Sequence, residues 1–181
     1  MLCSQEKLFM EAVARFLMAF IRVKNIKGNK YAYLVENTWK KRKGASRQKV
    51  GKYLGKVISL QRTGKEEFTR PLPETKEGIA LTLVEHELLQ HGFVKEGENL
   101  IQMDLRFSLP LKRFVDAKGE AVNVVAEMNE GFLCRETLAA LLRFKPRRED
   151  EREDAIALAK AFLEAGLRVP HAAFVAYFEK I

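Results

Sequence analysis

Residues 19–56, AFIRVKNIKGNKYAYLVENTWKKRKGASRQKVGKYLGK, are the most basic stretch of the chain and decide how its N-terminal part folds. They contain twelve Lys or Arg residues and a single acid, Glu36, which gives a net charge of +11. The whole chain of 181 residues carries +8, so the remainder is mildly acidic. Positive charge concentrated in one segment is typical of a surface that binds a polyanion.

Three runs of aromatic and β-branched residues within this stretch predict an antiparallel meander. The runs are 20–24, 31–39 and 47–57, and turns containing Gly28 and Gly44 separate them. Because side chains alternate along a strand, we expect positions 47, 49, 51 and 53 to share one face. A sheet of only three strands needs a helix or a partner to cover its apolar face.

The composition changes near residue 70. Residues 61–76 contain Pro71 and Pro73 and lack a clear period, which is typical of a linker. A helix is expected over 75–90, followed by short strands between 93 and 128. Three further helices are expected: one over 132–144, one that begins in the charge run 147–154 and ends at 165, and one over 171–180. We assign residues 1–18 to an N-terminal helical extension, 19–70 to the basic meander and linker, and 71–181 to an α+β module.

The predicted fold class is therefore α+β, with a small basic three-stranded antiparallel β-meander followed by an α+β module that ends in three helices. Met18 is an alternative start, and residues 1–17 would then be peripheral. The apolar run 16–21, like the others in the chain, is far shorter than the roughly 20 residues of a membrane span. The two cysteines, Cys3 and Cys134, give no disulfide framework or zinc cluster. We expect a cytoplasmic protein without a membrane partner, cofactor or metal.

The basic meander predicts a non-enzymatic nucleic-acid-binding protein that recognises backbone and shape. Its cations would neutralise phosphates and its aromatic rings would stack on bases, although core packing is an equal interpretation for Trp39. Few Asn or Gln residues are available to contact base edges, so structured RNA, including that of a ribosome or another nucleoprotein, fits as well as DNA. The candidate interface comprises Arg22, Lys24, Lys27, Lys30, Tyr31, Tyr33, Trp39, Lys40, Lys41, Arg42, Lys43, Arg47, Lys49, Lys52 and Tyr53.

Residues 20–55 resemble the N-terminal basic β segment of some DDE-type insertion-sequence transposases and of archaeal proteins of unassigned role. The matching residues are Phe20–Arg22, Tyr31–Glu36 and Arg47–Gly55. The resemblance implies a nucleic-acid-associated β module. It does not imply transposition, because the chain departs from the pattern after residue 60 and is too short for the catalytic fold. Its four aspartates, at 104, 116, 150 and 154, show no spacing of a metal-binding triad.

Two other motifs contain residue types that serve in catalysis. His86 and His91 resemble the two histidines of a zincin helix but are five residues apart, which places them about 140° from each other around a helix. We expect His91 near the C-terminal end of that helix. Cys134 is expected to be a buried thiol on the apolar face of the helix over 132–144. A small enzyme with a site around Cys134, a histidine and a carboxylate is the less favoured alternative.

Interaction with a protein is the main alternative to nucleic-acid binding. In that case the basic face would bind an acidic partner, as in an assembly factor. The C-terminal helices are unusually apolar, which indicates either a domain core or a homodimer interface. The residues concerned are Phe162, Leu163, Phe174, Val175, Tyr177 and Phe178.

Overall fold

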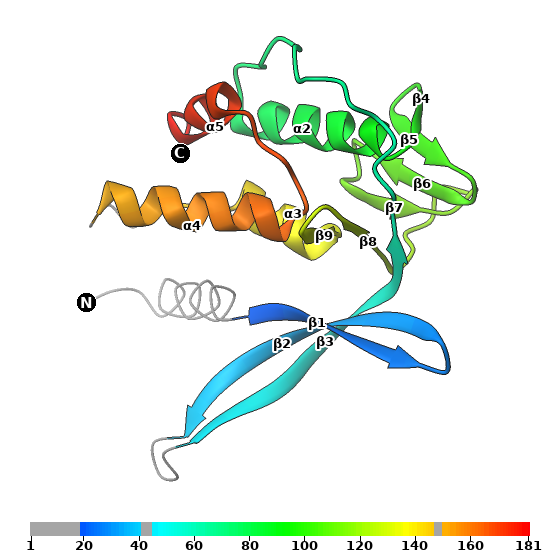
Figure 1. Ribbon diagram of the computed structural model, residues 1–181, viewed down its shortest axis with the longest axis vertical. Helices are drawn as coiled ribbons and strands as arrows, with labels where there is room; N and C mark the ends of the chain where they lie inside the picture. Colours follow the sequence, from blue (N-terminus) through cyan, green and yellow to red (C-terminus); the bar gives the residue numbers. More distant parts are fainter. Residues whose placement is uncertain (1–18, 41–44, 147–149) are drawn as a thin grey trace. The chain divides into compact units, whose positions relative to one another are not determined.

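The computed structural model describes residues 19–40, 45–146 and 150–181, and between positions 36 and 50 it describes the backbone alone. Helices and strands are both abundant, so the α+β class is confirmed (Figure 1). The chain forms two compact units, of which the first ends at Val57 and the second runs from Ile58 to Ile181.

The first unit contains the predicted antiparallel meander. Its strands are β1 (Ala19–Ile26), β2 (Asn29–Lys40) and β3 (Ala45–Ser59), and the last residues of β3 belong to the second unit. Lys27 and Gly28 form the first turn with φ of 50° and 80°. Positive φ at both central residues is the geometry that a two-residue hairpin turn requires. The lysine-rich tip at Lys41, Arg42 and Lys43 lies outside the described residues.

Strand β3 is not regular. Val50 pairs with Val35 and Lys52 pairs with Leu34, so Gly51 has no partner across the strand pair. One unpaired residue in one strand is a β-bulge, and it reverses the face to which the following residues point. A glycine within a strand often marks such a bulge, because it has no side chain to pack.

The second unit contains a four-stranded sheet, a hairpin and four helices within the described residues. Strands β4 to β7 form the sheet in sequence order, β8 pairs with β9, and β8 also lies beside the end of β3. The elements are α2 (Lys76–Gln90), β4 (Val94–Glu96), β5 (Asn99–Gln102), β6 (Leu105–Ser108), β7 (Arg113–Val115), β8 (Val124–Met128), β9 (Gly131–Leu133), α3 (Arg135–Leu142), α4 (Glu151–Glu164) and α5 (His171–Phe178).

Helix α2 begins and ends close to the positions that the sequence pattern predicts. Thr75 is its N-cap and accepts a hydrogen bond from the Gly78 amide, and Gly92 follows its C-cap with a φ of 86°. The amides of Gly92 and Phe93 donate to the carbonyls of Leu89 and Leu88, which is the usual hydrogen-bond pattern behind a left-handed glycine stop. The helix predicted over 132–144 is shorter than expected, because its first residues pair with β8 as strand β9.

The core of the second unit lies between the helices, the four-stranded sheet and the hairpin of β8 and β9. Helix α2 packs against α3, α5 and β5, while α4 contacts α3, α5 and β9. Phe162 of α4 and Tyr177 of α5 are buried, and the Tyr177 hydroxyl donates to the Leu141 carbonyl at 2.8 Å. Burial raises the pKa of Tyr177 to about 12. These rings are core residues, whereas Leu163 and Val175 are 48% and 39% exposed, and homodimerisation through them stays a prediction.

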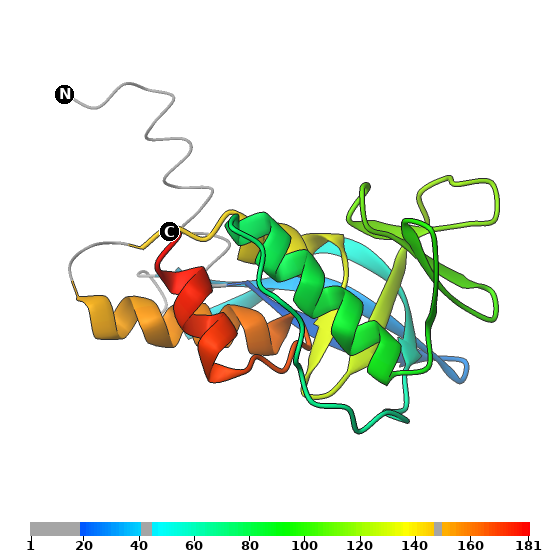
Figure 2. The same cartoon turned by 90° about the horizontal axis from the view of Figure 1, so that it is seen from above.

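An extended segment, residues 60–75, runs back along α2 in the opposite direction before the helix begins (Figures 1 and 2). The amides of Thr63 and Gly64 both donate to the Gln90 carbonyl, and Phe68 packs edge-on against His86. We call this segment the strap. It belongs to the second compact unit, in which the predicted boundary near residue 70 also lies.

Gly131, the first residue of β9, lies against the end of α4. A Cβ atom at this position would be 2.0 Å from the Leu163 carbonyl oxygen and 2.5 Å from the Gly166 amide nitrogen. Both neighbours are backbone atoms that cannot move aside alone. We expect Gly131→Ala to lower the free energy of unfolding by about 1–3 kcal/mol, as overpacked cores do, measured by urea denaturation. The adjacent exposed Glu130→Ala should be nearly neutral, and equal unfolding midpoints for both variants would contradict the close packing.

Candidate nucleic-acid interface

Side chains on one face of the meander form two rows across its three strands. In the first row, Lys24 of β1 pairs with Tyr31 of β2, and Tyr31 pairs with Lys56 of β3. Directly paired residues of antiparallel strands lie on the same face of a sheet. This row therefore has one aromatic ring between two cations.

The second row lies two residues further along β2. Arg22 of β1 pairs with Tyr33, and Tyr33 pairs with Tyr53 of β3. Positions two apart along a strand share a face, so the two rows are neighbours. We call the six residues of these rows the tyrosine face: Arg22, Lys24, Tyr31, Tyr33, Tyr53 and Lys56.

The three rings contact one another. The centroid of Tyr53 lies 5.5 Å from that of Tyr33 and 6.3 Å from that of Tyr31, with the rings tilted. The ammonium group of Lys24 lies 4.9 Å from the centroid of Tyr33, within the range of a cation–π interaction. Partial burial, with the neighbouring Tyr31 and Tyr33, raises the pKa of Tyr53, which is therefore neutral at physiological pH.

Lys56 reaches this face because of a second bulge in β3. Tyr33 pairs with Tyr53 and Ala32 pairs with Gly55, so Leu54 between them has no partner across the strand pair. Gly55 has a φ of 143°, which glycine adopts most easily. Simple alternation would place Lys56 on the face opposite Tyr53, and the predicted interface did not include it. The glycines of β3 are the sequence feature that could have located it.

The bulge at Gly51 overturns another expectation. Position 49 pairs with position 36 and position 47 with position 38, which lie on the face opposite Tyr33. The expectation that positions 47, 49, 51 and 53 share a face is therefore wrong. Four residues of the predicted interface lie in the paired strands β2 and β3, where the structure describes only their backbone: Trp39, Lys40, Arg47 and Lys49. Lys41, Arg42 and Lys43 lie outside the described residues.

Three other predicted cations whose side chains are described lie outside the tyrosine face. Lys27 and Lys30 are exposed at the turn between β1 and β2, and Lys52 is exposed and pairs with Leu34 on the opposite face. Residues 20–35 and 51–57, whose side chains are described, include six cations and no acid. The described charged side chains of the first unit are therefore all positive.

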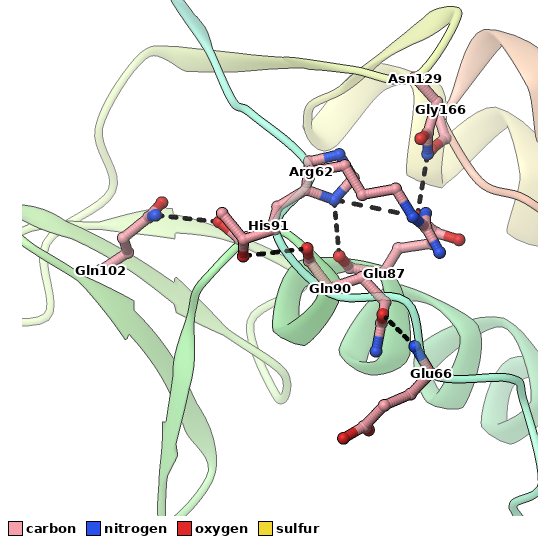
Figure 3. A network of polar contacts seen from close by, with 9 residues as sticks. Arg62, Glu66, Glu87, Gln90, His91, Gln102, Asn129 and Gly166 are labelled. Atoms are coloured by element: carbon pink, nitrogen blue, oxygen red, sulfur yellow. Dashed lines mark hydrogen bonds and ion pairs between the residues drawn. The ribbon is translucent and has the colours of Figure 1, made fainter.

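In the second unit, the carboxylate of Glu87, on α2, belongs to a network of polar contacts (Figure 3). It is 1% exposed and accepts hydrogen bonds from Arg62 of the strap at 2.8 Å and from Asn129 at 2.9 Å. The Asn129 amide also donates to the Gly166 carbonyl at 2.7 Å. Glu87 thus joins α2 to the strap and to the turn that follows β8, and Asn129 extends this connection to the turn that follows α4.

The two histidines of α2 make different contacts. His91 is the C-cap of the helix, as expected, and its Nδ1 lies 2.8 Å from the Glu87 carbonyl oxygen. Because a carbonyl can only accept, this nitrogen carries the proton. His86 packs against Phe68 instead, and burial lowers its pKa. Within the described ranges, no three His, Cys, Asp or Glu side chains are grouped so as to hold a metal ion.

Cys134 is a buried free thiol at the N-cap of α3. Its sulfur lies 3.6 Å from the Thr137 hydroxyl, and burial raises the pKa of the thiol. A raised pKa disfavours the thiolate, which is the nucleophilic form. The geometry therefore gives no support to a reaction at Cys134.

Glu87 should stabilise the second unit more than an exposed acid does. Glu87→Ala leaves Arg62, whose side chain is only 25% exposed, without its carboxylate. We expect the free energy of unfolding to fall by about 3 kcal/mol, the lower end of the cost of breaking a buried ion pair. Urea denaturation measures this loss, and exposed Glu96→Ala is the control. Similar midpoints for the two variants would show that the Glu87 contacts contribute little.

Glu85 should make stability depend on pH. Burial opposes its ionisation, but hydrogen bonds from Lys95 and Arg70 outweigh burial and lower its pKa from 4.5. A lowered folded-state pKa gives stability that is present above the unfolded value and is lost as pH falls through the folded value. Glu85→Gln should therefore be less stable than the parent chain at pH 7. In urea titrations from pH 7 to pH 3 the difference should shrink below about pH 4.5, and a constant difference would contradict this origin.

In the described part of the chain, no helix has the length and apolarity needed to cross a membrane. The chain matches no protein-family model, no curated protein and no solved structure. The resemblance of residues 20–55 to transposase N-terminal segments therefore stays a prediction, and the functional argument depends on the geometry of the tyrosine face.

Proposed function

We propose that this protein binds nucleic acid through the tyrosine face of its basic meander, without catalysing a reaction. The observation that carries the proposal is the pairing of cations and rings in two adjacent rows, Lys24–Tyr31–Lys56 and Arg22–Tyr33–Tyr53. The absence of acids among residues 20–35 and 51–57 supports it, since no described carboxylate of that unit would repel phosphates.

The expected mode of recognition is through the backbone and the shape of the nucleic acid. Lys and Arg release counterions when they neutralise phosphates, so affinity should fall steeply with salt and depend little on sequence. The described tyrosine face presents no Asn or Gln, the side chains that pair with adenine edges. Structured RNA, including ribosomal RNA, and DNA both fit these properties.

Binding of an acidic protein is the alternative, because the same cations would attract carboxylates. The rings favour nucleic acid, since bases offer flat surfaces on which aromatic side chains stack. Capture from a cell lysate with and without nuclease separates the two. Partners that disappear after nuclease treatment support the proposal, and partners that persist favour the protein alternative.

Reversing the charges of the tyrosine face should weaken binding strongly. In the triple variant Arg22→Glu, Lys24→Glu and Lys56→Glu, we expect affinity for a labelled RNA or DNA oligonucleotide to fall more than tenfold at low salt. The slope of log K against log salt should decrease in magnitude by about 2, because each lost phosphate contact removes about 0.7–0.9. Fluorescence anisotropy across a salt series measures both quantities.

The matched control reverses three exposed lysines of the second unit, Lys65, Lys118 and Lys180. It changes the net charge by the same amount and leaves the meander intact. If both triple variants lose the same affinity, binding depends on overall charge and not on this face. Absence of binding by the parent chain at low salt would overturn the proposed function.

A further inference from the structure

The rings of the tyrosine face offer chemistry that its cations do not. Lysine and arginine contact phosphates whether a nucleic acid is single-stranded or paired. A neutral tyrosine ring instead presents a flat π surface, which stacks on the face of a base. In a duplex the base faces are already stacked on one another, and only unpaired nucleotides can present them. Three rings clustered on one sheet surface therefore point to a strand with unpaired bases.

The spacing of the two rows supports the same conclusion. Tyr31 and Tyr33 are two residues apart along β2, which places their rows about 6.7 Å apart. Successive bases along one duplex strand are separated by about 3.4 Å. The rows therefore match bases that have moved apart rather than bases in a regular stack. Each row also contains at least one cation, so it can hold the phosphate next to the base.

The rings are not equivalent. The Lys24 ammonium group lies 4.9 Å from the centroid of Tyr33 and occupies the space next to that ring. Tyr53, which packs against Tyr33 at 5.5 Å, is 45% exposed and is in contact with both other rings. Tyr31 lies in the neighbouring row between two lysines. Tyr53 and Tyr31 are therefore the rings placed to receive bases, and Tyr33 supports them.

We infer that the tyrosine face binds unpaired nucleotides of RNA or DNA in preference to a duplex, with Tyr53 and Tyr31 each stacking on one base. This inference rests on the proposed function and specifies its ligand. Lys24, Lys56 and Arg22 would contact the phosphates on either side of the two stacked bases. The preference comes from the rings, so it should be separable from the salt-dependent affinity that the cations supply.

The test compares three labelled probes by fluorescence anisotropy at one fixed salt concentration: a 12-nucleotide single strand, a blunt duplex of the same length, and a single strand with abasic sites in place of its bases. DNA is used for all three, and RNA is used for the single strand and the duplex. We expect the parent chain to bind the single strand about tenfold more tightly than the duplex or the abasic strand, as one stacked base contributes. Tyr53→Ala should lose this preference and keep its affinity for the duplex.

Tyr53→Phe is the matched control, because it keeps the ring and removes only the hydroxyl; it should bind like the parent chain. Circular dichroism and urea denaturation check that both variants fold. If Tyr53→Ala does not fold, Tyr31→Ala gives an independent test of the same preference. Equal affinity for all three probes, or an unchanged preference after loss of either ring, would overturn the inference. In that case the proposed function still stands, whereas no binding of any probe at low salt would overturn both.

Discussion

The second unit depends on one buried carboxylate. Glu87 has almost no exposure to solvent, so its charge requires partners inside the protein. Arg62 and Asn129 supply them from segments that are distant in sequence, and Asn129 extends the connection to the Gly166 carbonyl. If the strap or either turn took another position, the buried Glu87 carboxylate would lose a hydrogen-bond partner or the support of that partner. The network therefore selects one arrangement of these segments around α2.

The tyrosine face depends on irregularities rather than on regular structure. Two bulges, at Gly51 and Leu54, change the register of β3 relative to β2. The second bulge returns Lys56 to the face that carries Tyr53, and the pairing of Tyr33 with Tyr53 brings the rings together. Bulges are frequent where a strand must redirect a side chain. In this protein they produce two mixed rows of cations and rings, which a perfectly alternating strand would not contain.

Much of the fold could be predicted from local patterns. The three strands of the meander, the turn at Gly28 and the ends of α2 follow from alternation, glycine conformation and capping, each of which acts over a few residues. The strap could not be recognised in this way. Its prolines and polar residues are typical of a linker, and its order comes from hydrogen bonds to Gln90 and Glu87, which lie more than twenty residues away. The candidate interface was partly predicted, since Tyr31, Tyr33 and Tyr53 were named from the sequence and Lys56 was not.

By itself, the sequence determined that positive charge and tyrosine gather in one antiparallel meander, because charge and strand alternation are properties of neighbouring residues. Only the tertiary structure decided which of these residues face the same way. The register between β2 and β3 depends on where the bulges form, and this is settled by pairing between strands rather than within one. It likewise decided that Glu87, whose position in the sequence resembles that of an ordinary surface acid of a helix, is buried and bound by partners from two other segments, Arg62 and Asn129.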